Sequence, residues 1–271
     1  MRTQTSQAGA LVPSERHHAF CGIAVDALGP DRLIDTFASG VARGERVLVG
    51  HHNLHGLSLL QDDAFRTFFD LTDANFVDGM SMVMLGRLAG RGLERDDRAT
   101  VLDWIWLLFA RAEQEGWRVA HLGSHGDVID EARTKVASIH PGLELTCIDG
   151  FFDPTPGSPG NTAVLESLAE CRPHVLLVGM GMPRQERWIL DNLDQLPDCV
   201  IVTVGGILGY LGEDRATPPR WMGRYGLEWL ARLATEPRRL AHRYLVEPIP
   251  LVPTLATAVL RDRRGLRRTG Y

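Results

Sequence analysis

Short apolar runs recur along the second half of the chain, and a segment with helical spacing follows each of them. The runs lie at 117–123, 143–150, 174–181 and 199–206. Continuous apolar runs are typical of strands buried on both faces, and strands that alternate with helices indicate βαβ units. The pattern therefore predicts a Rossmann-like parallel sheet over 117–214, with ligands bound at the carboxyl ends of its strands.

The chain ahead of this region shows a weaker form of the same alternation. Strand-like runs lie at 19–28, 45–50 and 74–79, and helical spacing covers 31–44, 54–60, 81–90 and 100–116. This predicts a smaller α/β lobe over 19–116. Residues 1–18 are polar and lack the apolar centre of a signal peptide, so we expect a disordered leader there.

The pattern changes again after Gly206. Two short helices rich in tryptophan and arginine are expected, followed by an apolar run at 248–260 that prolines break. No apolar run reaches the ~20 residues that span a bilayer. The predicted fold class is therefore α/β, with a Rossmann-like parallel sheet, a smaller N-terminal α/β lobe and a helical basic appendage over 215–271.

The composition of the 271-residue chain is ordinary for a soluble globular protein, but its charge is unevenly spread. The net charge is −5, yet residues 215–271 hold twelve arginines and four acidic residues. Trp221 and Trp229 lie among these arginines, which fits nucleic acid, a membrane surface, or an amphipathic helix with a solvated basic face. The acidic body disfavours nucleic acid, and the apolar run beside the last arginines favours an anionic membrane surface.

Signals for a bound metal are weak. Histidines 51 and 55 have a spacing found in zinc sites, but no third ligand follows nearby. The acidic pairs at 62–63 and 96–97 lie in surface-like stretches. None of the four cysteines forms a CxxC pair, which indicates reduced core thiols in a cytoplasmic protein. We expect no metal and no separate cofactor.

One strand–turn–helix segment, PHVLLVGMGMPRQERW, carries the strongest candidate chemistry. Its strand ends at Gly179 and Gly181, and Pro183 suits the first helical turn, so unpaired N–H groups can form an anion site. Gln185 and Glu186 fall in the same turn, where they either touch a ligand or face solvent. Arginine replaces the third glycine of the dinucleotide fingerprint, which disfavours a nicotinamide-dependent oxidoreductase but not a phosphate site.

A second candidate site follows two strands of the first lobe. Asp78 ends one of them, where Gly79 lets the chain turn away, so its carboxylate can accept a proton from a hydroxyl group. The alternative is that Asp78 caps the helix beginning near Met80. Asn53 follows the earlier strand between histidines and could bind a sugar by hydrogen bonds.

These motifs resemble those of the WecG/TagA/CpsF glycosyltransferases. VGMGMPRQERWI resembles the long signature of that family, and GLEWLARLATEPRRLAHRYL is similar to its C-terminal motif. NFVDGMSMV, IDGFF, VGGILGYLGE and Asn53 match in the same order along the chain. The resemblance covers roughly residues 20–247.

The resemblance implies transfer of an N-acetylmannosamine-type sugar or related hexose, with inversion, from a UDP-sugar to a polyprenyl-diphosphate-linked acceptor. The site would be at the inner face of the cytoplasmic membrane, where the protein is peripheral and a homo-oligomer is one option. Asp78 matches the proposed base. The residues implied in substrate binding are Asn53, Gly79, Arg98, Asp103, Gly179, Gly181, Pro183, Gln185, Glu186, Gly205 and Gly206. Those implied in acceptor or membrane contact are Arg215, Arg220, Arg224, Arg232 and Arg238.

Four positions depart from the family pattern. His51 replaces a usual threonine, Val101 a glycine, Gly209 an acidic residue and Thr217 an arginine. These departures bear on the identity of the sugar. They also leave open a non-catalytic, membrane-associated scaffold of polysaccharide assembly.

Overall fold

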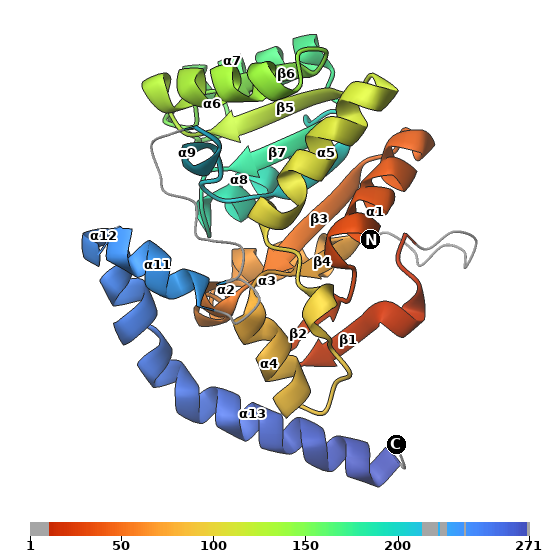
Figure 1. Ribbon diagram of the computed structural model, residues 1–271, viewed down its shortest axis with the longest axis vertical. Coiled ribbons are helices and arrows are strands. Elements are labelled where there is room, and N and C mark those ends of the chain that lie inside the picture. Colours follow the sequence, from red (N-terminus) through yellow and green to blue (C-terminus); the bar gives the residue numbers. More distant parts are fainter. Residues whose placement is uncertain (1–10, 213–221, 223–226, 236, 270–271) are drawn as a thin grey trace.

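The computed structural model describes residues 11–212, 222, 227–235 and 237–269, and within them eight strands form one sheet between layers of helices (Figure 1). The strand order is β1-β2-β4-β3-β8-β7-β5-β6, and only β1 and β2 pair antiparallel. The predicted α/β class and Rossmann-like parallel sheet are confirmed. The strands are β1 (His17–Phe20), β2 (Ile23–Asp26), β3 (Val47–His52), β4 (Ala74–Val77), β5 (Arg118–Gly123), β6 (Glu144–Ile148), β7 (Val175–Gly179) and β8 (Val200–Thr203).

The two predicted lobes share this sheet. β8 comes from the second predicted lobe but pairs with β3 of the first, with Val47 opposite Val200 and Val49 opposite Val202. On its other side, β8 pairs with β7. A local apolar run does not specify its partner strands, so the sequence pattern could not show that β8 joins the two halves.

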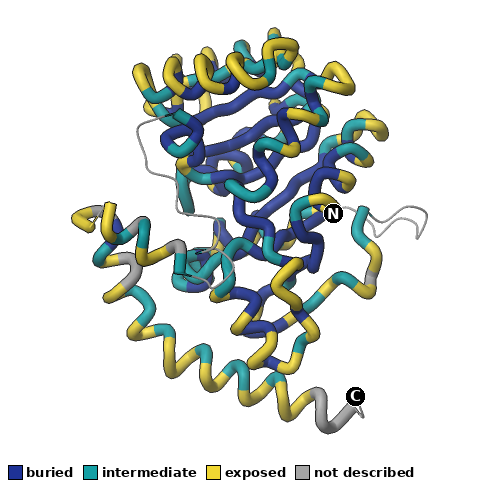
Figure 2. The backbone as a smooth tube through the Cα atoms, in the orientation of Figure 1, coloured by how far each residue is buried: buried dark blue, intermediate teal, exposed yellow. Residues whose placement is uncertain are grey.

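Helices cover both faces of the sheet, and its central strands β3, β4, β7 and β8 are buried (Figure 2). Fully buried Trp104 lies on the first face, with the rings of Phe37 and Phe76 edge-on at 5.5 and 5.8 Å. Such pairs add about 0.5–1.5 kcal/mol each beyond area burial. The first face is covered by α1 (Gly29–Arg43), α5 (Val101–Glu115), α6 (Gly126–Ile139) and α9 (Leu208–Leu211). The second is covered by α3 (Asp63–Leu71), α7 (Pro159–Cys171) and α8 (Arg184–Asn192).

A third apolar cluster fills the end of the sheet near β1 and β2. It includes residues of α2 (Leu54–Ser58) and α4 (Met80–Leu88). Leu255, Ala258 and Val259 of the last helix pack against it. The C-terminal segment therefore covers part of the core of the body.

The described part of the C-terminal segment is almost entirely helical. It contains α11 (Glu228–Thr235), α12 (Pro237–Ala241), a π-helical turn (His242–Val246) and α13 (Pro248–Thr269). The expected break at 248–260 is wrong, because α13 is one helix. Pro248 and Pro250 fall in its first turn, where no intrahelical N–H is needed, and Pro253 is exposed. Among the described residues, no helix is both long and apolar enough to cross a membrane.

The described N-terminal residues are ordered earlier than expected. A 3₁₀ turn spans Ser14–Arg16, and β1 begins at His17, whose Nδ1 lies 2.9 Å from Oδ1 of Asp26 on β2. The predicted boundary of the leader at residue 18 is therefore too late. Residues 1–10 lie outside the described residues.

Candidate active site

The predicted site residues converge on one edge of the sheet. Because β3, β4, β7 and β8 are parallel, their carboxyl ends share that edge. Asn53 follows β3, Asp78 follows β4, Gly179 ends β7 and Gly205 follows β8. The edge thus combines polar side chains at β3 and β4 with glycine turns at β7 and β8.

The carboxylate of Asp78 is oriented by its neighbours. Its Oδ2 accepts a hydrogen bond of 3.1 Å from Nδ2 of Asn53, and its backbone N–H donates to the carbonyl oxygen of His52 at 3.0 Å. The side chain is 23% exposed. Gly79, with φ of 98°, is the N-cap of α4, which has no side-chain cap. The helix-cap alternative for Asp78 is therefore wrong.

Asn53 has two contacts that fix its amide group. Its Oδ1 accepts a hydrogen bond of 2.9 Å from the backbone N–H of Gly56, which makes it the N-cap of α2. Because Oδ1 is used in the cap, Nδ2 points toward Asp78. The local start of α2 thus sets the direction of the hydrogen bond to the carboxylate.

His51, one of the four departures, lies directly behind this pair. Its side chain is 4% exposed, and its Nδ1 is 3.0 Å from both the carbonyl oxygen and Oγ1 of Thr203 on β8. Its Nε2 is 3.8 Å from Oδ2 of Asp78. The ring stacks on Phe76, with the ring centroids 5.3 Å apart. The imidazole therefore connects the end of β8 to the carboxylate that follows β4.

Gln185 joins the two glycine turns. It is fully buried, and its Oε1 accepts hydrogen bonds of 3.2 Å from the N–H groups of both Gly181 and Gly205. Its Nε2 donates to Oε1 of Glu186 at 2.8 Å. The alternative of a solvent-facing Gln185 or Glu186 is wrong, because both side chains are buried beneath the turns.

Burial changes the protonation of Glu186. Loss of hydration raises the pKa of its carboxyl group to about 7, although the hydrogen bond from Gln185 opposes the shift. Its Oε2 is buried without a hydrogen-bond partner among the described residues. Glu186 thus titrates near neutral pH directly under the predicted anion site.

Two glycines at this edge, Gly123 and Gly179, are required by close packing. A Cβ at Gly179 would lie 2.6 Å from the carbonyl oxygen of Gly205 and 2.7 Å from Nε2 of His121. A Cβ at Gly123 would lie 2.5 Å from the carbonyl oxygen of Gly179. His121 is completely buried, which lowers its pKa to about 3 and keeps it neutral. His121 was not among the predicted site residues. The sequence feature that could have indicated its position is a histidine inside the apolar run at 117–123.

Arg98 and Asp103 form a pair beside β4. The N–H of Ala99 donates to the carbonyl oxygen of Val77, which places Arg98 next to the end of that strand. Its guanidinium lies 3.0 Å from Oδ1 of Asp103. Asp103 also forms a capping box with Thr100 at the start of α5. Asp103 therefore has a local structural role, and it holds Arg98 near the candidate base.

Other predicted contributors lie apart from this edge or outside the description. The part of the chain that the structure describes contains no group of three or more His, Cys, Asp or Glu residues that could hold a metal. His55 contacts Glu247, with Nδ1 and Oε2 2.7 Å apart. Arg215, Arg220, Arg224 and Thr217 lie outside the described residues. Arg232 falls in α11, and Arg238 is exposed on α12.

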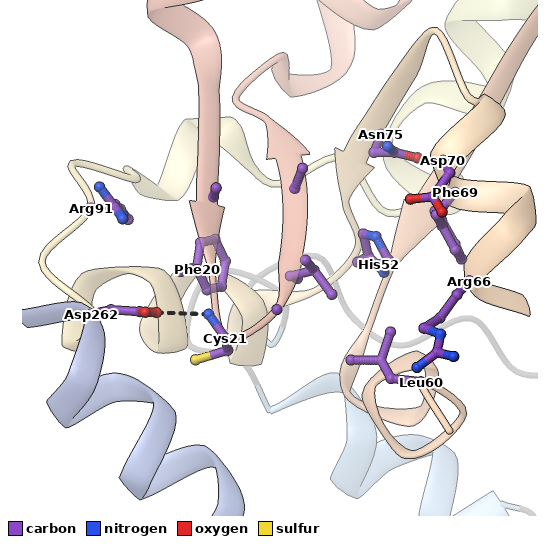
Figure 3. Close-up of a pocket in the computed structure, with 14 residues that line it drawn as sticks. Phe20, Cys21, His52, Leu60, Arg66, Phe69, Asp70, Asn75, Arg91 and Asp262 are labelled. Atoms are coloured by element: carbon purple, nitrogen blue, oxygen red, sulfur yellow. Dashed lines mark hydrogen bonds between the residues drawn. The ribbon is translucent and has the colours of Figure 1, made fainter. Parts of the chain in front are cut away.

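A cavity of about 480 Å³ lies on the other side of β3 (Figure 3). His52 and Asn75 line it, because side chains at successive strand positions face opposite ways. His52 stacks on Phe69 at 3.9 Å between ring centroids, and burial lowers its pKa to about 3. The cavity does not include Asp78, so it is separate from the carboxyl-edge site.

A parallel sheet with glycine turns and a carboxylate at its carboxyl edge is typical of α/β proteins that bind a ligand there. The chain belongs to the glycosyl transferase WecG/TagA/CpsF family, whose model matches residues 18–267. The predicted resemblance is therefore confirmed.

Two relatives carry the same name, N-acetylglucosaminyldiphosphoundecaprenol N-acetyl-beta-D-mannosaminyltransferase. One is from Bacillus subtilis and is 28% identical over 210 residues, which is 76% of each chain. The other is from Bacillus spizizenii and is 27% identical over 217 residues, covering 80% of this chain and 79% of the relative.

Proposed function

We propose that this protein transfers a sugar from a UDP-sugar to a polyprenyl-diphosphate-linked acceptor, with inversion, in the synthesis of a cell-surface polysaccharide. The names of both relatives specify an N-acetylglucosaminyldiphosphoundecaprenol acceptor and an N-acetylmannosaminyl group, which supports this substrate class. The donor is an N-acetylmannosamine-type or related UDP-sugar. Among the observations on the chain itself, the oriented carboxylate of Asp78 carries the proposal.

The mechanism is a single displacement. The acceptor hydroxyl attacks the anomeric carbon as Asp78 removes its proton, and the bond to the UDP oxygen breaks on the opposite face. UDP leaves with that electron pair. The turn from Gly179 to Pro183 leads into the start of α8, where the helix dipole stabilises a departing diphosphate. The basic C-terminal segment, with twelve arginines and four acidic residues over 215–271, adds positive charge. No metal takes part in this proposal, and strong stimulation by Mg²⁺ or Mn²⁺ after chelation would count against it.

UDP release provides the test of this function. The protein is mixed with UDP-N-acetylmannosamine and a polyprenyl-diphosphate-linked N-acetylglucosamine, and the product is checked by mass spectrometry. Replacing Asp78 by Asn should lower kcat by about 10²–10⁴-fold, since the amide cannot accept the proton. Asp130→Asn, an exposed change on α6, is the matched control and should leave kcat unchanged.

The two outcomes of this assay separate the enzyme from its alternative. Full activity in a folded Asp78→Asn protein would remove the assignment of the base. Failure of the wild type to release UDP from any of a panel of UDP-sugars would favour the non-catalytic scaffold.

The C-terminal segment supports a peripheral position on an anionic membrane at its cytoplasmic face. Large apolar side chains are exposed at Ile249 (66%) and Val252 (62%) of α13, while Arg261, Arg263 and Arg264 are exposed farther along the helix. Apolar insertion combined with attraction to anionic lipids stabilises such binding.

Vesicle sedimentation tests the membrane contact. Replacing Ile249 and Val252 together by Ser should reduce binding to phosphatidylglycerol-containing vesicles, whereas Ile139→Ser on α6 should not. Equal binding of all three proteins would contradict the membrane role. Substitution is preferable to deletion of 215–271, because α13 also covers part of the core.

A further inference from the structure

The cavity beside β3 is lined by two buried polar side chains whose hydrogen bonding is incomplete. Nδ1 of His52 and Oδ1 of Asn75 are buried and have no hydrogen-bond partner among the described residues. His52 is 1% exposed and Asn75 is 6% exposed. Buried polar atoms of this kind cost about 1–3 kcal/mol each when they remain unsatisfied. Their position in a cavity wall indicates that a bound molecule completes the site.

The two side chains lie on the same face of neighbouring strands. Asn75 precedes Val77 by two positions, and Val77 is the residue that pairs with His52. The ring of Phe69 on α3 stacks on that of His52, with the ring centroids 3.9 Å apart. Figure 3 shows His52 and Asn75 beside Phe69, and Phe20 of β1 across the cavity from them. The cavity therefore combines polar groups with aromatic surface.

The C-terminal helix contributes to the wall of this cavity. Oδ2 of Asp262 on α13 accepts a hydrogen bond of 2.8 Å from the backbone N–H of Cys21, which follows β1 (Figure 3). The volume of about 480 Å³ lies within the range of about 300–1,000 Å³ that is usual for small-molecule sites. The cavity is thus large enough for an organic ligand.

The charges around the cavity favour an uncharged ligand. Two arginines, Arg66 and Arg91, are balanced by two aspartates, Asp70 and Asp262. Burial lowers the pKa of His52 to about 3, so its ring is neutral at pH 7. A phosphate or carboxylate group would therefore meet no net positive charge. A hydroxyl group suits the site better, because it can both donate and accept a hydrogen bond and so fits either tautomer of the imidazole.

We propose that this cavity binds an uncharged pyranose sugar. Hydroxyl groups of the sugar form hydrogen bonds with His52 and Asn75, and its C–H groups pack against Phe20. A planar nucleobase fits less well, since His52 already covers a face of the Phe69 ring. The inference is independent of the proposed function, because neither Asp78 nor the glycine turns line the cavity.

NMR titration of the full-length protein with N-acetylglucosamine, in the absence of UDP, tests the proposal. We expect the amide resonances of Ile23, Ala24 and Asn75 to shift at millimolar sugar. Shifts confined to Gly181 and Gly205 at the carboxyl edge, or no shifts at all, would overturn the proposal. UMP is the comparison ligand, and shifts at the cavity with UMP but not with the sugar would contradict an uncharged ligand.

Substitutions in the cavity provide the second part of the test. His52→Phe keeps a ring that can stack on Phe69 but removes both nitrogens, so sugar affinity at the cavity should fall about tenfold or more. Ala24→Phe, at a less buried position of the lining, should block the cavity and keeps the test decisive if His52→Phe does not fold. Ala163→Phe, at an exposed position of α7, is the matched control and should bind normally. Unchanged sugar affinity in either cavity variant, shown to be folded by thermal unfolding, would overturn the proposal.

Discussion

The two halves of the carboxyl edge are built in opposite ways. At β3 and β4 the functional groups are side chains, and the carboxylate of Asp78 is 23% exposed. At β7 and β8 the edge consists of glycine turns, and the N–H groups of Gly181 and Gly205 donate to the buried side chain of Gln185 beneath them. The first half presents the candidate base on a partly exposed side chain, which should tolerate substitution with little effect on the core. In the second half, the conformation of the glycine turns depends on the buried side chain of Gln185.

This difference predicts how substitutions divide between stability and turnover. A change beneath the glycine turns should alter the free energy of unfolding and the affinity for UDP together. The hydrogen bonds to Gln185 stabilise the fold and also hold the turns in their conformation. A change at the Asp78 side should alter kcat with a smaller effect on folding. Substitutions at four side chains test that division, from the largest expected effect to the smallest.

Glu186 should make stability depend on pH. Its carboxyl group has a folded-state pKa of about 7, against an ordinary value of 4.5 for a solvated glutamate. Between these values the folded state binds more protons than the unfolded state, so stability falls as pH rises. The full loss is about 3 kcal/mol at 1.36 kcal/mol per pKa unit. Urea unfolding of the wild type and of Glu186→Gln from pH 5 to 8 measures it.

The comparison with Glu186→Gln isolates this one carboxyl group from the other titrating residues. The difference in unfolding free energy between the two proteins should change steadily up to about pH 7 and then level off. Parallel curves over the whole range would mean that burial does not shift the pKa of Glu186.

Gln185→Leu should lower stability by about 2 kcal/mol and weaken UDP binding. The leucine has a similar size but leaves the N–H groups of Gly181 and Gly205 without their acceptor, and unsatisfied groups of this kind cost about 1–3 kcal/mol. Urea unfolding and calorimetric titration with UDP measure both effects. Gln114→Leu, at an exposed position of α5, is the control. Normal UDP affinity in Gln185→Leu would show that the glycine turns keep their conformation without the hydrogen bonds to Gln185.

The sequence predicted the elements of this edge better than their connections. The glycine turn at 179–181 and the Asp-Gly pair at 78–79 could be recognised because local backbone chemistry specifies a strand end and a turn. The pairing of β3 with β8 could not, since it joins residues about 150 positions apart in the chain and no local pattern encodes it. The burial of Gln185 was missed for a related reason. Polar residues in a first helical turn usually face solvent, and only the position of Gly205 explains why this one is enclosed.

Asn53 allows its two functions to be separated. Asn53→Ala removes both the cap of α2 and the hydrogen bond to Asp78, so it should cost about 1 kcal/mol of stability and lower kcat. Asn53→Asp keeps an acceptor for the cap but places a like charge beside the carboxylate, so it should lower kcat with stability nearly unchanged. Ser158→Ala, which removes the cap of α7, should lower stability alone. Equal kcat in all three variants would contradict the orienting role of Asn53.

Glu247→Gln should have the smallest effect, and it tests whether the C-terminal segment influences only the Asp78 side of the edge. Oε2 of Glu247 lies 2.7 Å from Nδ1 of His55 on α2, the helix that Asn53 caps. Both side chains are partly exposed, so loss of the ion pair should cost less than about 1 kcal/mol. A contact that reaches α2 should change kcat slightly, while the affinity for UDP, which we propose depends on the turns at β7 and β8, stays constant. A drop in UDP affinity without any change in kcat would show instead that the C-terminal segment acts on the glycine turns. That result would contradict the division of the edge into a half that affects kcat and a half that affects UDP affinity.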